Sequence, residues 1–180
     1  VLGAAKGLWH AHLGWLFTTV GQADRRRYGA DLLRDRGIRL IDSAERPLIA
    51  ASLVLPFLIG LAVKGTLTGA FLTLVLGGLL RIVLVHHFTW STNSVCHLFG
   101  KRPVRSDDRS SNVAALAVLS LGESWHNAHH AFPRLARHGV DRRQLDLTAL
   151  AIRGWEKLGW AHDVHWPQPA SLTRKRVATC

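Results

Sequence analysis

The chain has 180 residues, 48% of them hydrophobic, which is enough for one domain with a core of its own. Its formal net charge of +11, with 11 His counted as neutral, favours an anionic partner or a membrane surface; because the basic residues form no stripe interleaved with aromatic side chains, we predict that it does not bind nucleic acid. Two cysteines, Cys96 and Cys180, cannot form a disulfide framework and are predicted to be free thiols.

The first part of the chain is amphipathic and then polar. The chain begins at Val1 and contains no Met, which we interpret as a sign of a fragment. Residues 1–20 are rich in aromatic residues, and His10 and His12 lie among them in a pattern typical of a membrane interface. Residues 21–46 are charged, with apolar positions at helical spacing.

Two apolar runs follow. Leu48–Val63 is an uncharged run of 16 residues, and Leu67–Leu80 is also uncharged, with Lys64 between the two. A helix needs about 20 residues to cross the hydrocarbon core of a bilayer, and long basic side chains such as Lys64 and Arg81 extend such runs by reaching the membrane surface. We therefore predict an all-α integral-membrane protein rather than a soluble one with a buried hairpin. It should have one transmembrane hairpin at about residues 48–85 and a cytosolic helical cap that carries histidine boxes.

Basic residues predict the orientation of this hairpin. Eight Lys or Arg precede Pro47 and more follow residue 85, whereas the turn between the two runs has only Lys64. By the positive-inside rule both ends face the cytoplasm. We expect a bacterial inner-membrane protein whose histidine clusters are cytoplasmic. Its predicted parts are residues 1–135, with the hairpin, and residues 136–180, a cytosolic helix with a basic tail.

Three histidines lie within five positions near the end of the first part. They are His126, His129 and His130. Positions i, i+3 and i+4 share one face of a helix, so the three imidazoles should converge, and neutral imidazole is a common ligand of Fe, Zn and Cu. Glu123, on the same helical face, is predicted to orient a ligand histidine by accepting its second N–H. Pro133 is predicted to end the helix.

A second candidate element consists of Asn93 and His97, which share a helical face at i and i+4. His97 follows the hairpin on the side where the histidine cluster is expected, and Asn93 is suited to hold a metal-bound water. Cys96 is predicted to pack in the interior. The remaining histidines lack a ligand partner at helical spacing, and we assign none of them to a metal. Those expected at the interface are His86 and His87; those expected to be exposed are His138, His162 and His165.

These stretches resemble the integral-membrane acyl-CoA desaturases of the stearoyl-CoA delta-9 type, in an actinobacterial-like form. Gly122–Pro133 resembles the last histidine box of that family, and Thr89–Pro103 resembles its Asn-x-x-x-His element. Trp9–Leu16 is similar to the segment after the middle box. The resemblance covers Leu8–Pro133, with the membrane hairpin in the matching place, and the other two boxes of the family do not occur in the chain.

The resemblance implies a cofactor and a set of site residues. The family binds two iron ions through nine His, with an Asn acting through water. Carried over by position, the direct iron ligands are His97, His126, His129 and His130. Asn93 is the ligand through water, and Trp90 lies near the acyl chain. Because the other five ligands are missing, the chain alone is expected to be inactive.

The implied activity is O2-dependent insertion of a cis double bond, at the delta-9 position, into a long-chain fatty acyl-CoA during fatty acid biosynthesis. The implied electron donor is external: a ferredoxin, a cytochrome b5-like protein or a flavin reductase. Arg102, Arg105 and Arg109 are candidates to hold the CoA phosphates or an acidic carrier. Alternatives that stay open are a membrane acyl-lipid desaturase, a hydroxylase and, in another class, an inactive membrane fragment that binds one metal or none.

Overall fold

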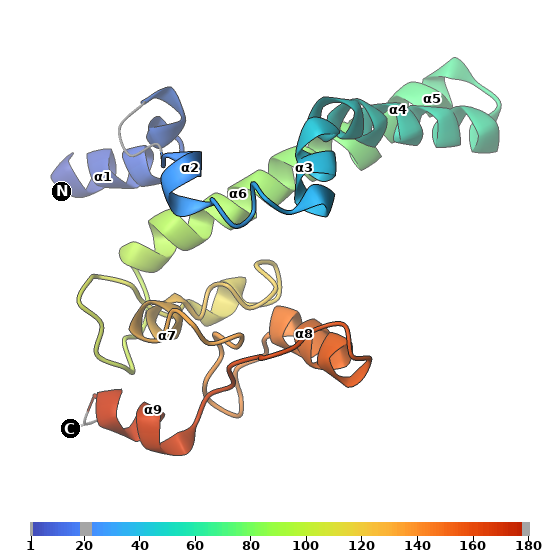
Figure 1. Ribbon diagram of the computed structural model, residues 1–180. Coiled ribbons are helices and arrows are strands. Elements are labelled where there is room, and N and C mark those ends of the chain that lie inside the picture. Colours follow the sequence, from blue (N-terminus) through green and yellow to red (C-terminus); the bar gives the residue numbers. More distant parts are fainter. Residues whose placement is uncertain (1, 19–22, 178–180) are drawn as a thin grey trace. The chain divides into compact units, whose positions relative to one another are not determined.

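The computed structural model describes residues 2–18 and 23–177, and over these ranges it contains helices and loops but no β-strand (Figure 1). The predicted all-α class is therefore confirmed. The chain divides into two compact units, Thr18–His86 and the combination of Val1–Phe17 with His87–Cys180, and each is described by itself. The predicted free thiol of Cys180 lies outside the described residues, as do the last positions of the predicted amphipathic zone.

Two short capped helices open the unit Thr18–His86. α2 (Arg25–Tyr28) begins after Asp24, and α3 (Arg36–Ser43) begins after Asp35. Each aspartate carboxylate accepts hydrogen bonds from N–H groups in the first turn. Such a cap satisfies donors that have no partner within the helix, so these local signals are sufficient to start both helices.

Both predicted apolar helices are present in this unit. The first is α4 (Glu45–Lys64), and the second is a continuous helical run of α5 (Leu67–Thr73), the π-helical segment η2 (Leu74–Leu80) and α6 (Arg81–Ser94). By length and composition, α4 with 20 residues and the run Leu67–His97 with 31 residues are able to cross a membrane. The second helix extends past the predicted limit at residue 85, because no Gly or Pro interrupts residues 79–99.

Small residues allow α4 and α5 to lie side by side (Figure 1). A Cβ atom added at Gly60 would lie 2.5 Å from Thr73 Oγ1, so the two backbones approach closely there. The rings of Phe57 and Phe71 meet edge to face beside this contact, with centroids 5.3 Å apart. Gly65, with φ at 64°, makes the left-handed turn between the helices. The predicted hairpin is thus a packed pair of helices.

Arg81 forms hydrogen bonds with both apolar helices. Its guanidinium donates from Nε to the Gly77 carbonyl at 3.0 Å, and from Nη2 to the Ser52 carbonyl of α4 at 3.5 Å. The charge is therefore directed towards the backbone of the helix pair, where carbonyl oxygens accept its hydrogen bonds.

The second unit is a set of short helices joined by loops. In chain order it contains α1 (Leu2–His12), η1 (Gly14–Phe17), the end of α6, η3 (Val95–His97), η4 (Ala114–Leu116), α7 (His126–Ala131), α8 (Leu147–Lys157) and α9 (Pro169–Lys175). Two helices, α8 and α9, form after residue 135, where a helix and a basic tail are predicted. Lys175 Nζ donates to the Ala131 carbonyl at 2.6 Å, so residues on the two sides of position 135 pack together.

A small apolar core lies on one face of α7. Val104, Ala128 and Ala131 are buried there, and Phe132 and Val140 pack against them. Because Ala128 and Ala131 are three positions apart, they form one buried stripe of the helix. This packing fixes the rotation of α7 about its axis and therefore the direction of its histidines.

Candidate metal centre

Asn127 anchors the start of α7 from within. Its side chain is fully buried; Oδ1 accepts from the Val104 N–H at 3.0 Å, and Nδ2 donates to Ser106 Oγ at 3.0 Å. Its own N–H donates to Asn112 Oδ1 at 2.9 Å. Sequence reasoning did not single out Asn127. Asn127, which lies between the candidate ligands His126 and His129, therefore joins α7 to the loop of residues 101–112 by hydrogen bonds.

The same loop positions His97. The Ser111 N–H and hydroxyl both donate to the Cys96 carbonyl, each at 2.7 Å. Cys96 is fully buried, as predicted from its packing role. Gly100 has φ at 121°, and a Cβ there would lie 2.5 Å from the Asn112 carbonyl oxygen, so only glycine fits. The loop of residues 101–112 therefore forms hydrogen bonds with both η3 and α7, the two helices that carry the candidate ligands.

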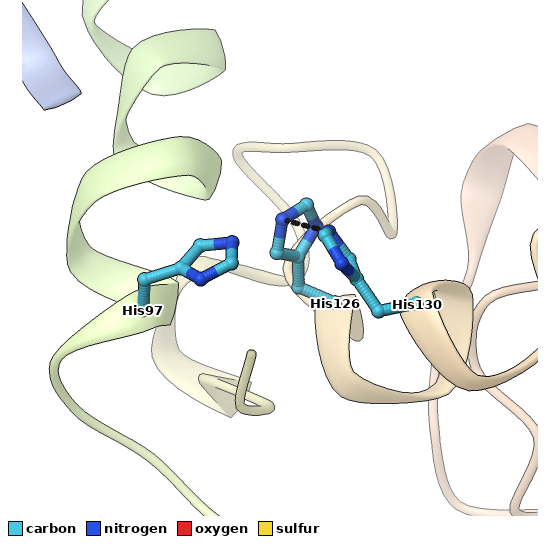
Figure 2. A group of neighbouring side chains, drawn as sticks. All are labelled: His97, His126 and His130. Carbon is cyan, nitrogen blue, oxygen red and sulfur yellow. Dashed lines mark hydrogen bonds between the residues drawn. The ribbon is translucent and has the colours of Figure 1, made fainter. Parts of the chain in front are cut away.

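Three of the four predicted histidine ligands converge. Figure 2 shows His97 from η3 facing His126 and His130 from α7. One ligand nitrogen from each ring lies within 4.8 Å of the others, and the two Nε2 atoms of His126 and His130 are 3.0 Å apart. Nitrogens bound to one ion at about 2.1 Å lie about 3.0–3.4 Å apart. The His126 and His130 pair on α7 has this spacing, and the ligand nitrogen of His97 lies within 4.8 Å of both.

His129 lies outside this group of three. Its ring centroid is 5.9 Å from that of His126 and 5.6 Å from that of His130, but only 4.3 Å from that of His138. The predicted exposure of His138 is wrong, because the loop after α7 folds back and half-buries its ring beside His129. His129 Nδ1 is buried and has no hydrogen-bond partner among the described residues. A buried imidazole nitrogen of this kind suits a metal ligand.

Asp108 is the acidic partner of the cluster. Its carboxylate contacts His130 Nδ1, and it accepts hydrogen bonds from the Ser110 hydroxyl at 2.6 Å and the Ser110 N–H at 3.0 Å. Burial opposes its ionisation, but the Ser110 hydrogen bonds and His130 outweigh burial and hold the Asp108 pKa below its usual range. With Nδ1 engaged by Asp108, His130 presents Nε2 to the group, an arrangement common around metal sites.

Glu123 does not share a helical face with His126. α7 begins only at His126, and the backbone before it turns through left-handed conformations at Leu121 (φ 55°) and Gly122 (φ 108°). Glu123 is exposed. Burial lowers the pKa of His138, and the charges of Asp146 and Glu123 oppose this effect. No sequence spacing pointed to Asp108, which lies in a loop.

Burial lowers the pKa of several of these imidazoles, which favours their neutral form. Burial and, after it, the neighbouring histidines lower the pKa of His126 to about 3. Burial followed by His138 lowers the pKa of His129, and burial lowers that of His138 although Asp146 and Glu123 oppose it. A neutral imidazole has the lone pair that a metal requires.

Two further predicted site residues, Asn93 and Trp90, lie on α6. Asn93 is exposed near the end of α6. Trp90 packs edge to face against His87 at 5.3 Å and His12 at 6.0 Å between ring centroids. His12 Nε2 lies 3.0 Å from His87 Nδ1, and His12 Nδ1 lies 2.8 Å from Ser94 Oγ. Sequence reasoning gave the two histidines separate interfacial roles, because nothing local joins residues so far apart.

The fatty acid desaturase family model matches residues 3–163. The chain therefore belongs to the fatty acid desaturase family.

Its relatives share about a third of its residues. A hex-5-enoyl-[acyl-carrier protein] acetylenase of Moorena producens is 36% identical over 99% of the chain and 55% of the relative. An sn-1 stearoyl-lipid 9-desaturase of Synechocystis is 34% identical over 94% of the chain and 51% of the relative. Delta-9 acyl-lipid desaturase 1 of Arabidopsis thaliana is 38% identical over 96% of the chain and 54% of the relative. The chain spans about half the length of these curated relatives.

The residues present fit iron, the metal that this family uses. The donors are imidazoles, two of them at the spacing of ligands on one ion, and one of these, His130, is backed by the Asp108 carboxylate. Imidazole with carboxylate support is a donor set typical of non-haem iron.

Proposed function

We propose that the complete gene product catalyses O2-dependent desaturation of a long-chain fatty acyl group at a histidine-ligated di-iron centre. In this proposal His97, His126, His129 and His130 are direct ligands and Asn93 is a ligand through water. The observation that carries the proposal is the convergence of His97, His126 and His130 in a chain of this family.

The chemistry explains why the site is built of imidazoles. Side chains alone cannot break an unactivated methylene C–H bond, and iron, when bound, supplies the redox chemistry that removes two neighbouring hydrogens. The chain's own part is to hold the ligand nitrogens neutral and in place. Asp108 orients His130, and Asn127 fixes the helix that carries three of the ligands.

We further propose that the acyl chain passes Trp90 and that the double bond forms at the delta-9 position. The relatives' names mention acyl-lipid, acyl-CoA and acyl-carrier-protein substrates, so acyl-CoA, the carrier favoured by the sequence, is one of three carriers to compare. Arg102 is less available for a phosphate than expected, because its guanidinium donates to Ser106 and to the Asp108 carbonyl. Arg105 and Arg109 stay candidates for phosphates or for a ferredoxin, cytochrome b5-like protein or flavin reductase.

Expression of the complete gene product in a bacterial host, followed by mass spectrometry of fatty acid methyl esters, tests the activity. We expect a new cis-monounsaturated ester, and we expect His126→Ala to reduce it at least about 100-fold because a ligand is lost. His162→Ala, at an exposed histidine, is the matched control and should retain the product. If the protein is inserted in the membrane and supplied with iron and reductant, the absence of a new ester contradicts the proposal. A hydroxylated ester favours the hydroxylase alternative.

The carrier is tested with purified protein and a reducing system. Stearoyl-CoA, stearoyl-acyl-carrier protein and stearoyl-phospholipid are offered separately. We expect oleoyl product from the CoA ester. Product from the phospholipid alone would favour the acyl-lipid alternative.

A further inference from the structure

The outward face of α8 is apolar. Ala149 is buried and Ile152 and Glu156 are half-buried, and their spacing of three and four positions places them on one side of the helix. That side therefore packs against the rest of the unit. Leu150 and Leu158 lie on the other side, about two turns apart, and are 60% and 62% exposed. The helix thus carries large apolar side chains where a helix in contact with water normally has polar ones.

Two tryptophans extend this apolar face at the end of the helix. Gly159, with φ at 72°, makes the turn that ends α8, and the Trp160 N–H donates to the Trp155 carbonyl at 2.8 Å. Trp155 is 49% exposed and Trp160 is 74% exposed. Because an indole ring combines a large apolar area with one N–H donor, exposed tryptophans are typical of the boundary between lipid and water. Leu150, Trp155, Leu158 and Trp160 together are called the α8 surface below.

Both exposed charges within α8 are basic. Arg153 and Lys157 are exposed beside Leu150 on the helix. The acidic residue of α8 is directed inwards, where Glu156 accepts from the Trp166 indole N–H at 3.0 Å. Apolar surface bordered by cations fits an anionic bilayer, because long basic side chains reach the headgroups while the apolar side chains enter the hydrocarbon boundary.

A cavity lined by four arginines lies beside the α8 surface. Its volume is about 370 Å³, and Leu150 lines it together with Arg137, Arg142, Arg143 and Arg153. Arg137 Nε is buried and has no hydrogen-bond partner among the described residues. In the same part of the chain, no carboxylate lies within ion-pair distance of the other three arginines. Several guanidinium groups around one cavity suit a phosphate group, whose oxygens accept paired hydrogen bonds from them.

The carboxylate that lines this cavity is already engaged by the backbone. Asp146 Oδ2 accepts from the His138 N–H at 2.8 Å and from the Gly139 N–H at 3.0 Å, and Oδ1 accepts from the Ala149 N–H at 2.8 Å. The lining therefore has four positive charges against one negative charge whose oxygens are directed to N–H groups. Such an excess of positive charge attracts an anion into the cavity.

We propose that the α8 surface is a membrane-contact face that enters the headgroup region of an anionic bilayer, and that the arginine-lined cavity holds the phosphate of one lipid. Two helices of the same chain are long and apolar enough to cross a membrane, and such an anchor raises the effective concentration of lipid at α8. An acidic protein would match the arginines but would leave the apolar α8 surface in water. The proposal depends on neither iron nor the desaturation reaction, so its failure leaves the proposed function standing.

The depth of a spin label tests the membrane contact. The complete gene product with Leu158→Cys is labelled with a nitroxide and reconstituted into nanodiscs that contain phosphatidylglycerol. Relaxation of the label by O2 and by a water-soluble nickel chelate gives its depth, which we expect to be about 5–10 Å into the boundary between headgroups and acyl chains. Asp107→Cys, at an exposed position of the same unit, is the control and should be reached by the nickel chelate. The labelled parent protein gives the background from Cys96 and Cys180.

Two outcomes of this measurement overturn the membrane contact. If the nickel chelate reaches the label of Leu158→Cys as readily as that of Asp107→Cys, the α8 surface faces water. If neither O2 nor the nickel chelate reaches the label of Leu158→Cys, protein covers the α8 surface instead of lipid.

The phosphate site is tested by removing charge from the cavity. We expect the Leu158→Cys label to lie deeper in phosphatidylglycerol than in phosphatidylcholine nanodiscs. The further change Arg142→Gln/Arg143→Gln should abolish this difference, because basic residues near an anionic surface supply the attraction. Arg134→Gln/Arg174→Gln removes the same charge at exposed positions outside the cavity and should keep the difference.

Three results contradict the phosphate site. Equal depth in the two lipids before any arginine is changed would mean that α8 does not recognise anionic lipid. Equal loss of the difference in the two double variants would mean that only total charge matters. Loss of the difference when inorganic phosphate is added at constant ionic strength would assign the cavity to a soluble phosphate instead of a lipid.

Discussion

Asp108 changes how the histidine cluster is understood at the scale of single residues. An imidazole can bind a metal ion only through a nitrogen whose lone pair is free. Whether three neighbouring imidazoles can bind one ion therefore depends on which nitrogen of each ring is free. The contact of the Asp108 carboxylate with His130 Nδ1 favours one arrangement of that ring, in which Nε2 lies opposite His126 Nε2. A loop carboxylate thus specifies the orientation of a ligand on a helix.

We predict that Asp108→Asn weakens iron binding by about 10–100-fold, because an amide no longer supplies the negative charge that makes His130 a stronger donor. Competition with a chelator of known iron affinity measures the change. Asp107→Asn is the matched control, since Asp107 is exposed in the same loop. Equal affinity in the two variants would show that Asp108 does not support a ligand.

At the scale of elements, the helix pair depends on where its small residues lie. A Cβ atom added at Gly60 would lie 2.5 Å from Thr73 Oγ1 and 2.8 Å from the Gly69 carbonyl oxygen, which is closer than a side chain allows. At Gly77 the nearest atom to an added Cβ is Pro56 Cβ at 3.6 Å, which is ordinary contact. The same substitution therefore has opposite consequences at two glycines of one hairpin.

We predict that Gly60→Ala lowers the free energy of unfolding by about 1–3 kcal/mol through overpacking. Gly77→Ala should leave it almost unchanged or raise it slightly, since alanine is the better helix former. Melting temperatures of the detergent-solubilised proteins measure both effects. Equal melting temperatures would mean that α4 and α5 are not in contact at Gly60.

At the scale of the whole molecule, the basic residues predict which side of a membrane the ends of the hairpin face. The positive-inside rule predicts that the turn at Lys64 is on the outside and that both flanks are in the cytoplasm. The described histidine ligands follow the second apolar helix, so this orientation would give them a cytoplasmic supply of reductant.

Labelling of introduced cysteines tests this orientation. In intact bacterial cells, Lys64→Cys should react with a membrane-impermeant maleimide, whereas Arg36→Cys in α3 should react only after the membrane is permeabilised. The parent protein gives the background from its own cysteines. Reaction of Arg36→Cys in intact cells, with Lys64→Cys protected, would reverse the predicted topology.

The sequence by itself determined the features that depend on neighbouring residues. Two uncharged runs predict two long apolar helices, and Pro133 predicts the end of α7, because apolar length and local backbone restriction act over a few residues. The His126–His130 spacing marked imidazoles as candidate ligands for the same reason. It did not show that His129 turns away towards His138.

The tertiary structure alone decided which distant residues meet. Asp108, rather than Glu123, reaches the cluster, because the helix starts at His126 after a left-handed turn and the loop of residues 101–112 folds back onto α7. His138 lies beside His129 because the buried Asp146 holds its backbone. These contacts depend on loop paths and long-range hydrogen bonds, and spacing along the chain carries no information about either.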